Sequence, residues 1–219
     1  MPKLLAMCTT SLGVDKGGGV AHDGRMKSSA IARRLREVVA AADSARRDPA
    51  LVEVWACGSF LDDEPGADAD AAVVLVVDVP AGELPWLNPH PVPYFWAERL
   101  GVRRLQMAWW GRPSAWPAWN QEARRVLRVW SAAGGEESGV LDVLGAGDVA
   151  SLPVVEPSGR ELLEQLRVER PVAVAQFDEV VDRYWDRDFR RGLAPNPEQV
   201  LWHAARAVRD LDVAIAALS

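Results

Sequence analysis

The chain has 219 residues, of which 49% are hydrophobic and 26% charged, and this suits one globular domain, or one α/β domain with a helical annex. Its net charge of -6 argues against a nucleic-acid-binding protein, because phosphate contacts usually require a basic face. The two cysteines indicate neither a disulfide framework nor a zinc site, so we expect a reducing, cytoplasmic setting in which Cys57 is a buried small hydrophobe.

The N-terminal residues 1–25 show little pattern and contain a run of glycines, which predicts a flexible leader. The short apolar patch at their start is interrupted before a signal-peptide core could form. No apolar run approaches the roughly 20 residues that cross a bilayer, so we expect no membrane partner. We divide the rest of the chain into an α/β domain, residues 26–150, and a C-terminal helical region, residues 151–219.

The first predicted elements are one helix and two strands. From Ser28 onward, a helical period places these apolar residues on one face: Ile31, Leu35, Val38, Val39 and Ala42. Residues 51–57, LVEVWAC, are short and rich in β-branched and aromatic types, which predicts a strand. Beyond an acidic loop, residues 71–79 form an apolar run without helical period, which indicates a strand covered on both faces.

The middle of the chain is rich in tryptophan and proline, and residues 83–120 hold six of the ten tryptophans. We expect a short helix near residues 94–100, a strand at residues 103–110 and a helix at residues 119–132. Residues 139–157 predict a short strand and a loop. Tryptophan buries much area, so we interpret the cluster as core and interface packing and not as a base-stacking surface. A protein partner could dock on this segment.

The C-terminal third predicts helices with clear starts. Ser158 and Glu161 form a capping-box pattern, and Asn196 with Pro197 is a second start signal. We also expect Pro171 to open a helix, whose predicted buried stripe is Phe177, Val180, Val181, Tyr184 and Trp185. The predicted stripe of the last helix is Leu201, Ala204, Ala205, Val208, Leu211 and Ile215, with His203 in solvent.

Chemistry-bearing residues gather between the first two strands. Asp68 and Asp70 precede the second strand two residues apart, and this spacing places both side chains on one side. Two hard oxygen ligands so placed suit Mg²⁺ that also holds a triphosphate. Gly58 and Ser59 leave the first strand, where glycine permits close approach of a phosphate and serine offers an N–H and a hydroxyl. The alternative is a polar hairpin loop, for which Gly and Asp are normal residues.

This pattern resembles the nucleotidyltransferase superfamily typified by DNA polymerase β and the kanamycin-type nucleotidyltransferases. The family pattern is an apolar residue, Gly, Gly or Ser, a spacer, and Asp-apolar-Asp/Glu-apolar; here CGS, an eight-residue spacer and DADA match it. The resemblance implies an α/β (α+β) fold with a small mixed sheet flanked by helices and a C-terminal helical annex. It also implies Mg²⁺ on Asp68 and Asp70, phosphates at Gly58 and Ser59, and transfer of a nucleoside monophosphate from a nucleoside triphosphate to a hydroxyl or amine acceptor.

Two departures from the family pattern leave other functions open. The family carries a third carboxylate on a later strand, whereas the matching place here holds Gln106 or its neighbours, and Asp142 is a substitute farther along the chain. The loop residues Asp62, Asp63 and Glu64 would also repel a triphosphate. The alternatives are a catalytically inactive binding or interaction protein with this fold, and a toxin-like nucleotidyltransferase paired with a neighbouring antitoxin.

Overall fold

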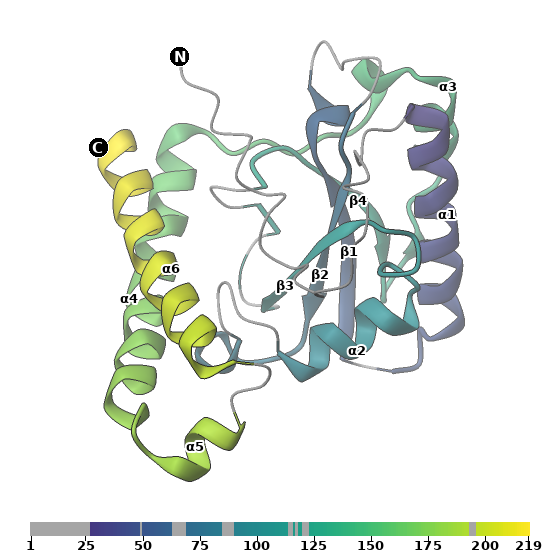
Figure 1. Ribbon diagram of the computed structural model, residues 1–219. Helices are drawn as coiled ribbons and strands as arrows, with labels where there is room; N and C mark the ends of the chain where they lie inside the picture. Colours follow the sequence, from purple (N-terminus) through teal and green to yellow (C-terminus); the bar gives the residue numbers. More distant parts are fainter. Residues whose placement is uncertain are drawn as a thin grey trace.

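The computed structural model describes residues 27–48, 50–62, 69–84, 90–113, 116, 118–119, 123–192 and 196–219; the predicted leader, residues 1–25, lies outside them. Figure 1 shows the helices and strands. In chain order they are α1 (Ser28–Ser44), β1 (Leu51–Cys57), β2 (Ala72–Val77), α2 (Pro91–Arg99), β3 (Ala108–Pro113), β4 (Val126–Ser131), β5 (Gly135–Glu136), α3 (Val140–Ala146), α4 (Gly159–Arg183), α5 (Arg187–Gly192) and α6 (Pro197–Leu218). Short 3-10 turns, η2 (Ser59–Leu61), η3 (Ala81–Glu83) and η4 (Val149–Ser151), connect some of them.

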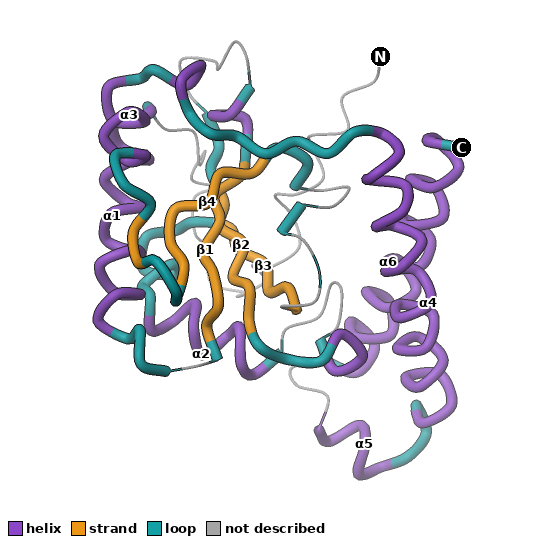
Figure 2. Tube along the Cα trace, turned by 180° about the vertical axis from the view of Figure 1, so that it is seen from behind, coloured by secondary structure: helices purple, strands orange, loops and turns teal. Residues whose placement is uncertain are grey.

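The described strands form one five-stranded mixed sheet in the order β3-β2-β1-β4-β5. β2 and β3 are parallel, and the other neighbouring strands are antiparallel. Helices α1 and α4–α6 lie on opposite sides of this sheet, as the front and back views show (Figures 1 and 2). The predicted fold class is therefore confirmed: a small mixed sheet flanked by helices, with further helices at the C-terminus.

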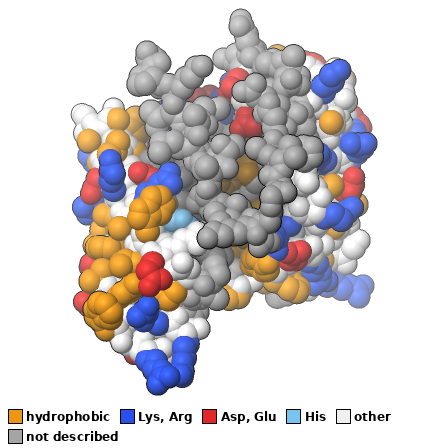
Figure 3. All heavy atoms as spheres, in the orientation of Figure 1, with side chains coloured by type: hydrophobic (Ala, Val, Ile, Leu, Met, Phe, Trp, Pro, Cys, Tyr) orange, Lys and Arg blue, Asp and Glu red, His pale blue; other side chains and the backbone are white. Residues whose placement is uncertain are grey.

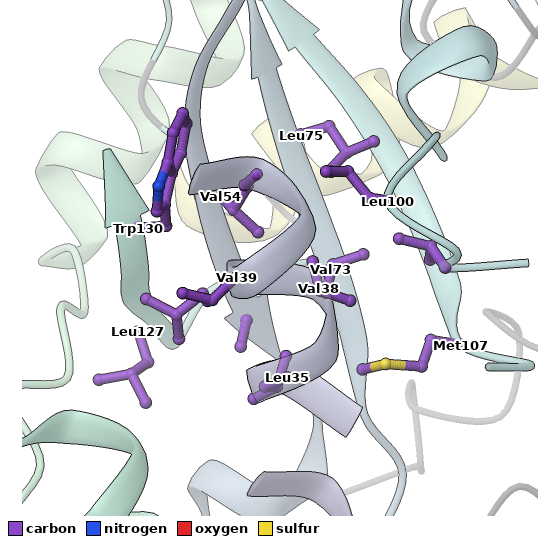
Figure 4. Close-up of a cluster of buried hydrophobic side chains, with 14 of the residues drawn as sticks. Leu35, Val38, Val39, Val54, Val73, Leu75, Leu100, Met107, Leu127 and Trp130 are labelled. Carbon is purple, nitrogen blue, oxygen red and sulfur yellow. The ribbon is translucent and has the colours of Figure 1, made fainter. Parts of the chain in front are cut away.

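The main core lies between α1 and the sheet. Each position of β2 is buried, and Val73, Leu75 and Val77 belong to the core that α1 covers. Figure 4 shows Leu35 and Val38 of α1 among these strand side chains. Full burial of one such side chain contributes roughly 1.5–3 kcal/mol. The predictions for α1, β1 and β2 are confirmed, including the strand that is covered on both faces.

The second face of β2 packs in a smaller cluster. Val74 and Val76 lie there with Cys57 of β1 and Val126 of β4. Cys57 is 2% exposed, as expected for a small hydrophobe. The described tryptophans of the middle segment also pack as expected: Trp96 is fully buried, and Trp109, Trp110, Trp116 and Trp119 join the hydrophobic clusters.

Three predictions for the middle of the chain are wrong. The helix expected at residues 119–132 is replaced in its second half by β4, because Val126–Ser131 pairs with β1 and has buried side chains on both faces. The strand expected at residues 103–110 begins only at Ala108, since residues 101–106 form turns. Residues 140–146 form α3 and not a strand, ended by Gly147 in the left-handed conformation at φ 80.

Helix α4 runs without interruption from Gly159 to Arg183 and contains Pro171, so the predicted start at Pro171 is wrong. Proline is tolerated here because it lies on the exposed side, where water can reach the carbonyl of Arg167 that loses its backbone partner. The predicted capping box is confirmed. The N–H of Glu161 donates to Oγ of Ser158 at 3.3 Å, and the Ser158 N–H donates to the Glu161 carboxylate at 2.8 Å.

The buried faces of the two long helices differ from the predicted stripes. In the first stripe Val180 is buried, whereas Val181 is 44% and Trp185 82% exposed. In α6, Ala204 and Leu211 are buried as predicted, but the other buried residues are Val200, His203 and Ala207. His203 is only 5% exposed, so the solvent position predicted for it is wrong. The buried stripe of α6 is shifted by about one residue from the predicted one, because contact with α4 decides which side of the helix is covered.

Two tryptophans of the C-terminal region are exposed, one in the turn between α4 and α5 and one in α6. Trp185 and Trp202 are 82% and 56% exposed, and arginines stack on both rings: Arg190 on Trp185 and Arg206 on Trp202. Figure 3 shows hydrophobic and basic side chains gathered over this part of the molecule. In the described part of the chain, no helix combines the length and hydrophobicity needed to cross a bilayer.

Candidate functional site

The candidate site begins where β1 leaves the sheet. Gly58 has φ 131, a conformation that side chains rarely allow, and it leads into the short turn η2. A Cβ on Gly58 would lie 2.4 Å from the carbonyl oxygen of Asp70. The buried side chains of Phe60 and Leu61 anchor the turn. Glycine is therefore required here by the close approach of two backbone segments.

Ser59 and Asp70 are bonded directly to each other. The Ser59 backbone N–H donates to Oδ1 of Asp70 at 3.0 Å, and the Ser59 hydroxyl donates to the same oxygen. In return, the backbone N–H of Asp70 donates to Oγ of Ser59 at 3.0 Å. Cys57 pairs with Ala72, and this antiparallel register, continued by two residues, sets Ser59 opposite Asp70.

These bonds leave the two oxygens of the Asp70 carboxylate in different situations. Oδ1 accepts both donors of Ser59, whereas no described residue donates to Oδ2. Asp70 itself is half-buried. A carboxylate that is held in this way can offer its second oxygen to a hard cation such as Mg²⁺.

The other predicted metal ligand, Asp68, lies outside the described residues. Within the ranges that the structure describes, no group of three or more His, Cys, Asp or Glu side chains could hold a metal ion. Asp70 is thus the described member of the predicted pair. The Mg²⁺ site stays a prediction.

Asp142, the predicted substitute for the third carboxylate, lies in the first turn of α3. Its side chain is 85% exposed and pairs with Arg36 of α1 at 2.8 Å. Helix α3 packs on α1. Asp70 lies two residues before Ala72, so its side chain points to the same face of the sheet as that of Ala72, which is the face away from α1. No hydrogen bond or ion pair between described residues joins Asp142 to Asp70. The catalytic role of Asp142 stays a prediction.

β3, the strand beside β2, contains no acidic residue that could lie next to Asp70. β3 reads AWWGRP and pairs in parallel with β2, with Ala108 next to Ala72. Gln106 lies two residues earlier, in a turn, with φ 54. A third carboxylate, if the chemistry needs one, has to come from elsewhere in the chain.

The segment that carries the site is acidic. Residues 50–84 contain no Lys or Arg, and their carboxylates are Glu53, Asp62, Asp63, Glu64, Asp68, Asp70, Asp78 and Glu83. Asp62 is exposed, and Asp63 and Glu64 lie outside the described residues. Like charges repel a triphosphate, so a nucleotide could bind here only with cations that screen it.

The sequence pattern placed Gly58, Ser59 and Asp70 near one another, and the structure brings these three together. The pattern gave no sign that Ser59 would use its donors on Asp70. The strand register could have indicated this hydrogen bonding, because Ser59 lies opposite Asp70 when Cys57 pairs with Ala72.

The exposure of Trp185 and Trp202 was not predicted from the sequence either, because helical periodicity alone assigned Trp185 to a buried stripe.

The chain belongs to a domain family of unknown function, DUF7711, whose model matches residues 26–217. The match spans the sheet and the C-terminal helices. No curated protein and no solved structure matches the chain. Its function therefore has to be argued from the site.

Proposed function

We propose that this member of the DUF7711 family is a Mg²⁺-dependent nucleotidyltransferase that works in the cytoplasm. It moves a nucleoside monophosphate from a nucleoside triphosphate to a hydroxyl or amine acceptor, with nucleic acid the least favoured acceptor because the net charge is -6. The observation that carries the proposal is the close contact of Gly58 and Ser59 with Asp70, at the head of a strand buried on both faces.

The proposed roles follow from this contact. Asp68 and Asp70 hold the cation, and the turn of Gly58 and Ser59 faces the β- and γ-phosphates. When bound, Mg²⁺ offsets phosphate charge and orients the α-phosphate. The acceptor oxygen or nitrogen attacks the α-phosphorus, the bond from this phosphorus to the bridging oxygen breaks, and pyrophosphate leaves. The acceptor proton passes to solvent water or to a base near Asp70, whereas Asp142, the residue that the sequence predicts for this role, lies on the α1 side of the sheet.

Calorimetric titration of the full chain with Mg²⁺ and each of ATP, GTP, CTP and UTP tests the proposal. We expect binding heat for at least one nucleotide, and we expect Asp70→Asn to abolish it. Asp142→Asn should change neither this heat nor turnover, because Asp142 pairs with Arg36 on the α1 side of the sheet. If none of the four nucleotides gives heat at millimolar concentration, the chain is not a nucleotidyltransferase.

A second candidate function is a binding or interaction protein that keeps the fold without the chemistry. The exposure of Trp185 and Trp202 favours it, because Trp and Arg are enriched at the centres of protein interfaces. The tryptophans of residues 83–120 are a poorer docking site, since those described are at least partly buried.

Asp68→Ala combined with Asp70→Ala separates the two functions. On the enzyme proposal, Mg²⁺ raises the melting temperature of the wild-type chain and has no effect on the double variant. On the interaction proposal, Mg²⁺ stabilises neither protein, and the double variant keeps its cellular phenotype. A shift for both proteins would place the cation elsewhere.

A further inference from the structure

We propose that Ser59 is a positioning residue for the carboxylate of Asp70 and not a ligand of the triphosphate. This inference rests on the proposed function, because it assigns how the cation-binding group is held. It changes the role that the family resemblance implies for Ser59, from contact with the substrate to contact with a protein side chain.

The donor inventory of Ser59 supports this role. A serine offers two donors, its backbone N–H and its hydroxyl, and both are directed at Oδ1 of Asp70. Its hydroxyl oxygen in turn accepts the backbone N–H of Asp70. Ser59 therefore has no donor left for a phosphate oxygen unless it first releases Asp70.

The same bonds fix the rotation of the carboxylate. The terminal torsion of an aspartate is broad, so an unrestrained carboxylate samples many orientations. Two donors on Oδ1 select one orientation and leave Oδ2 as the oxygen to which no described residue donates a hydrogen bond. Groups that orient a metal ligand from behind typically change metal affinity 10–100-fold when they are removed.

The backbone around the pair is fixed independently of any cation. The close approach of Gly58 to the Asp70 carbonyl and the antiparallel register of β1 with β2 hold Ser59 and Asp70 opposite each other. The geometry that presents Oδ2 thus exists before a cation binds, which reduces the ordering that binding has to accomplish.

Binding of Mn²⁺, used in place of Mg²⁺ and followed by the electron paramagnetic resonance signal of the free ion, tests the proposal on the full chain. Ser59→Ala should weaken binding of Mn²⁺ alone by about 10–100-fold. Ser59→Thr keeps the hydroxyl and should stay within about threefold of wild type. Ser44→Ala removes a hydroxyl that donates to the Ala40 carbonyl in α1, and it should bind as wild type does.

A second arm uses Mn²⁺ with inorganic tripolyphosphate and separates the two roles of Ser59. If Ser59→Ala binds Mn²⁺ as wild type does and loses only the tripolyphosphate, Ser59 is a phosphate ligand and the proposal is wrong. If Ser59→Ala does not fold, Ser59→Cys replaces it, since it keeps the volume and weakens the hydrogen bond; unchanged Mn²⁺ affinity again overturns the proposal. If wild type binds no Mn²⁺, the proposed function fails, and the positioning role fails with it.

Discussion

Two tryptophans in the main core differ in one hydrogen bond. Trp96 and Trp130 are 0% and 1% exposed and belong to the same hydrophobic cluster. The indole N–H of Trp130 donates to the Asp43 carboxylate at 2.7 Å, whereas that of Trp96 is buried with no hydrogen-bond partner among the described residues. A buried donor without a partner costs about 1–3 kcal/mol, and a hydrogen bond to a charged group contributes about 1.5–3 kcal/mol.

Replacing each tryptophan with phenylalanine should therefore have unequal effects. The smaller ring leaves a cavity that costs on the order of 1 kcal/mol in both variants. In Trp96→Phe, removal of the unpaired donor offsets this cost, so we expect a change near zero. Trp130→Phe also loses the bond to Asp43, and the expected loss is about 2.5–4 kcal/mol. Urea unfolding measures both, and equal losses would contradict this account.

Gly58 gives a second prediction at the level of single residues. Gly58→Ala forces a side chain into φ 131 and against the Asp70 carbonyl, so it should cost at least about 1–3 kcal/mol of unfolding free energy. Gly82→Ala is the matched control, because its added Cβ has no atom within 4 Å. Thermal unfolding compares the two. A stable Gly58→Ala chain would show that the backbones at the site are farther apart.

His203 predicts a dependence of stability on pH. Burial, with a smaller effect of Arg206, lowers the pKa of His203 below its ordinary value of 6.5. The unfolded chain then binds more protons as the pH falls through this value, so the unfolding free energy should decrease between about pH 7.5 and 5.5. Urea unfolding at several pH values measures the slope, which His203→Gln should reduce. An unchanged slope in this variant would mean that other groups cause it.

At the scale of elements, local signals predicted the elements whose structure is set locally. The capping box of Ser158 and Glu161 and the start at Asn196 appear where expected. β1 and β2 were predictable because short β-branched runs flanked by turn residues have few alternatives. β4 was not, because residues 119–132 contain charges at helical spacing, and pairing with β1 decides the conformation.

The capping box also makes a measurable contribution. Ser158→Ala removes the side-chain acceptor for the Glu161 N–H at the start of α4, and loss of such a cap costs about 1 kcal/mol. The same substitution at Ser44, which lies in the last turn of α1 and does not cap its start, should change stability little. Chemical denaturation resolves this difference. Equal effects at the two serines would show that α4 does not depend on its cap.

At the scale of the whole molecule, the fold class and the juxtaposition of Gly58, Ser59 and Asp70 were predictable, because two neighbouring strands and a glycine turn suffice to bring them together. The side of the sheet on which other groups lie was not. Asp142 is close to α1 because α3 packs there, and this long-range contact leaves no local trace in the sequence. The exposed tryptophans likewise depend on how α4 and α6 pack.

An anomalous diffraction map from crystals grown with Mn²⁺ and a non-hydrolysable nucleoside triphosphate tests directly whether Asp70 binds the cation. We predict a Mn²⁺ peak about 2.1 Å from Oδ2 of Asp70, with Asp68 in the same coordination sphere and Oδ1 still bonded to Ser59. An ordered site without a peak at millimolar Mn²⁺, or a peak remote from Asp70, would contradict the account.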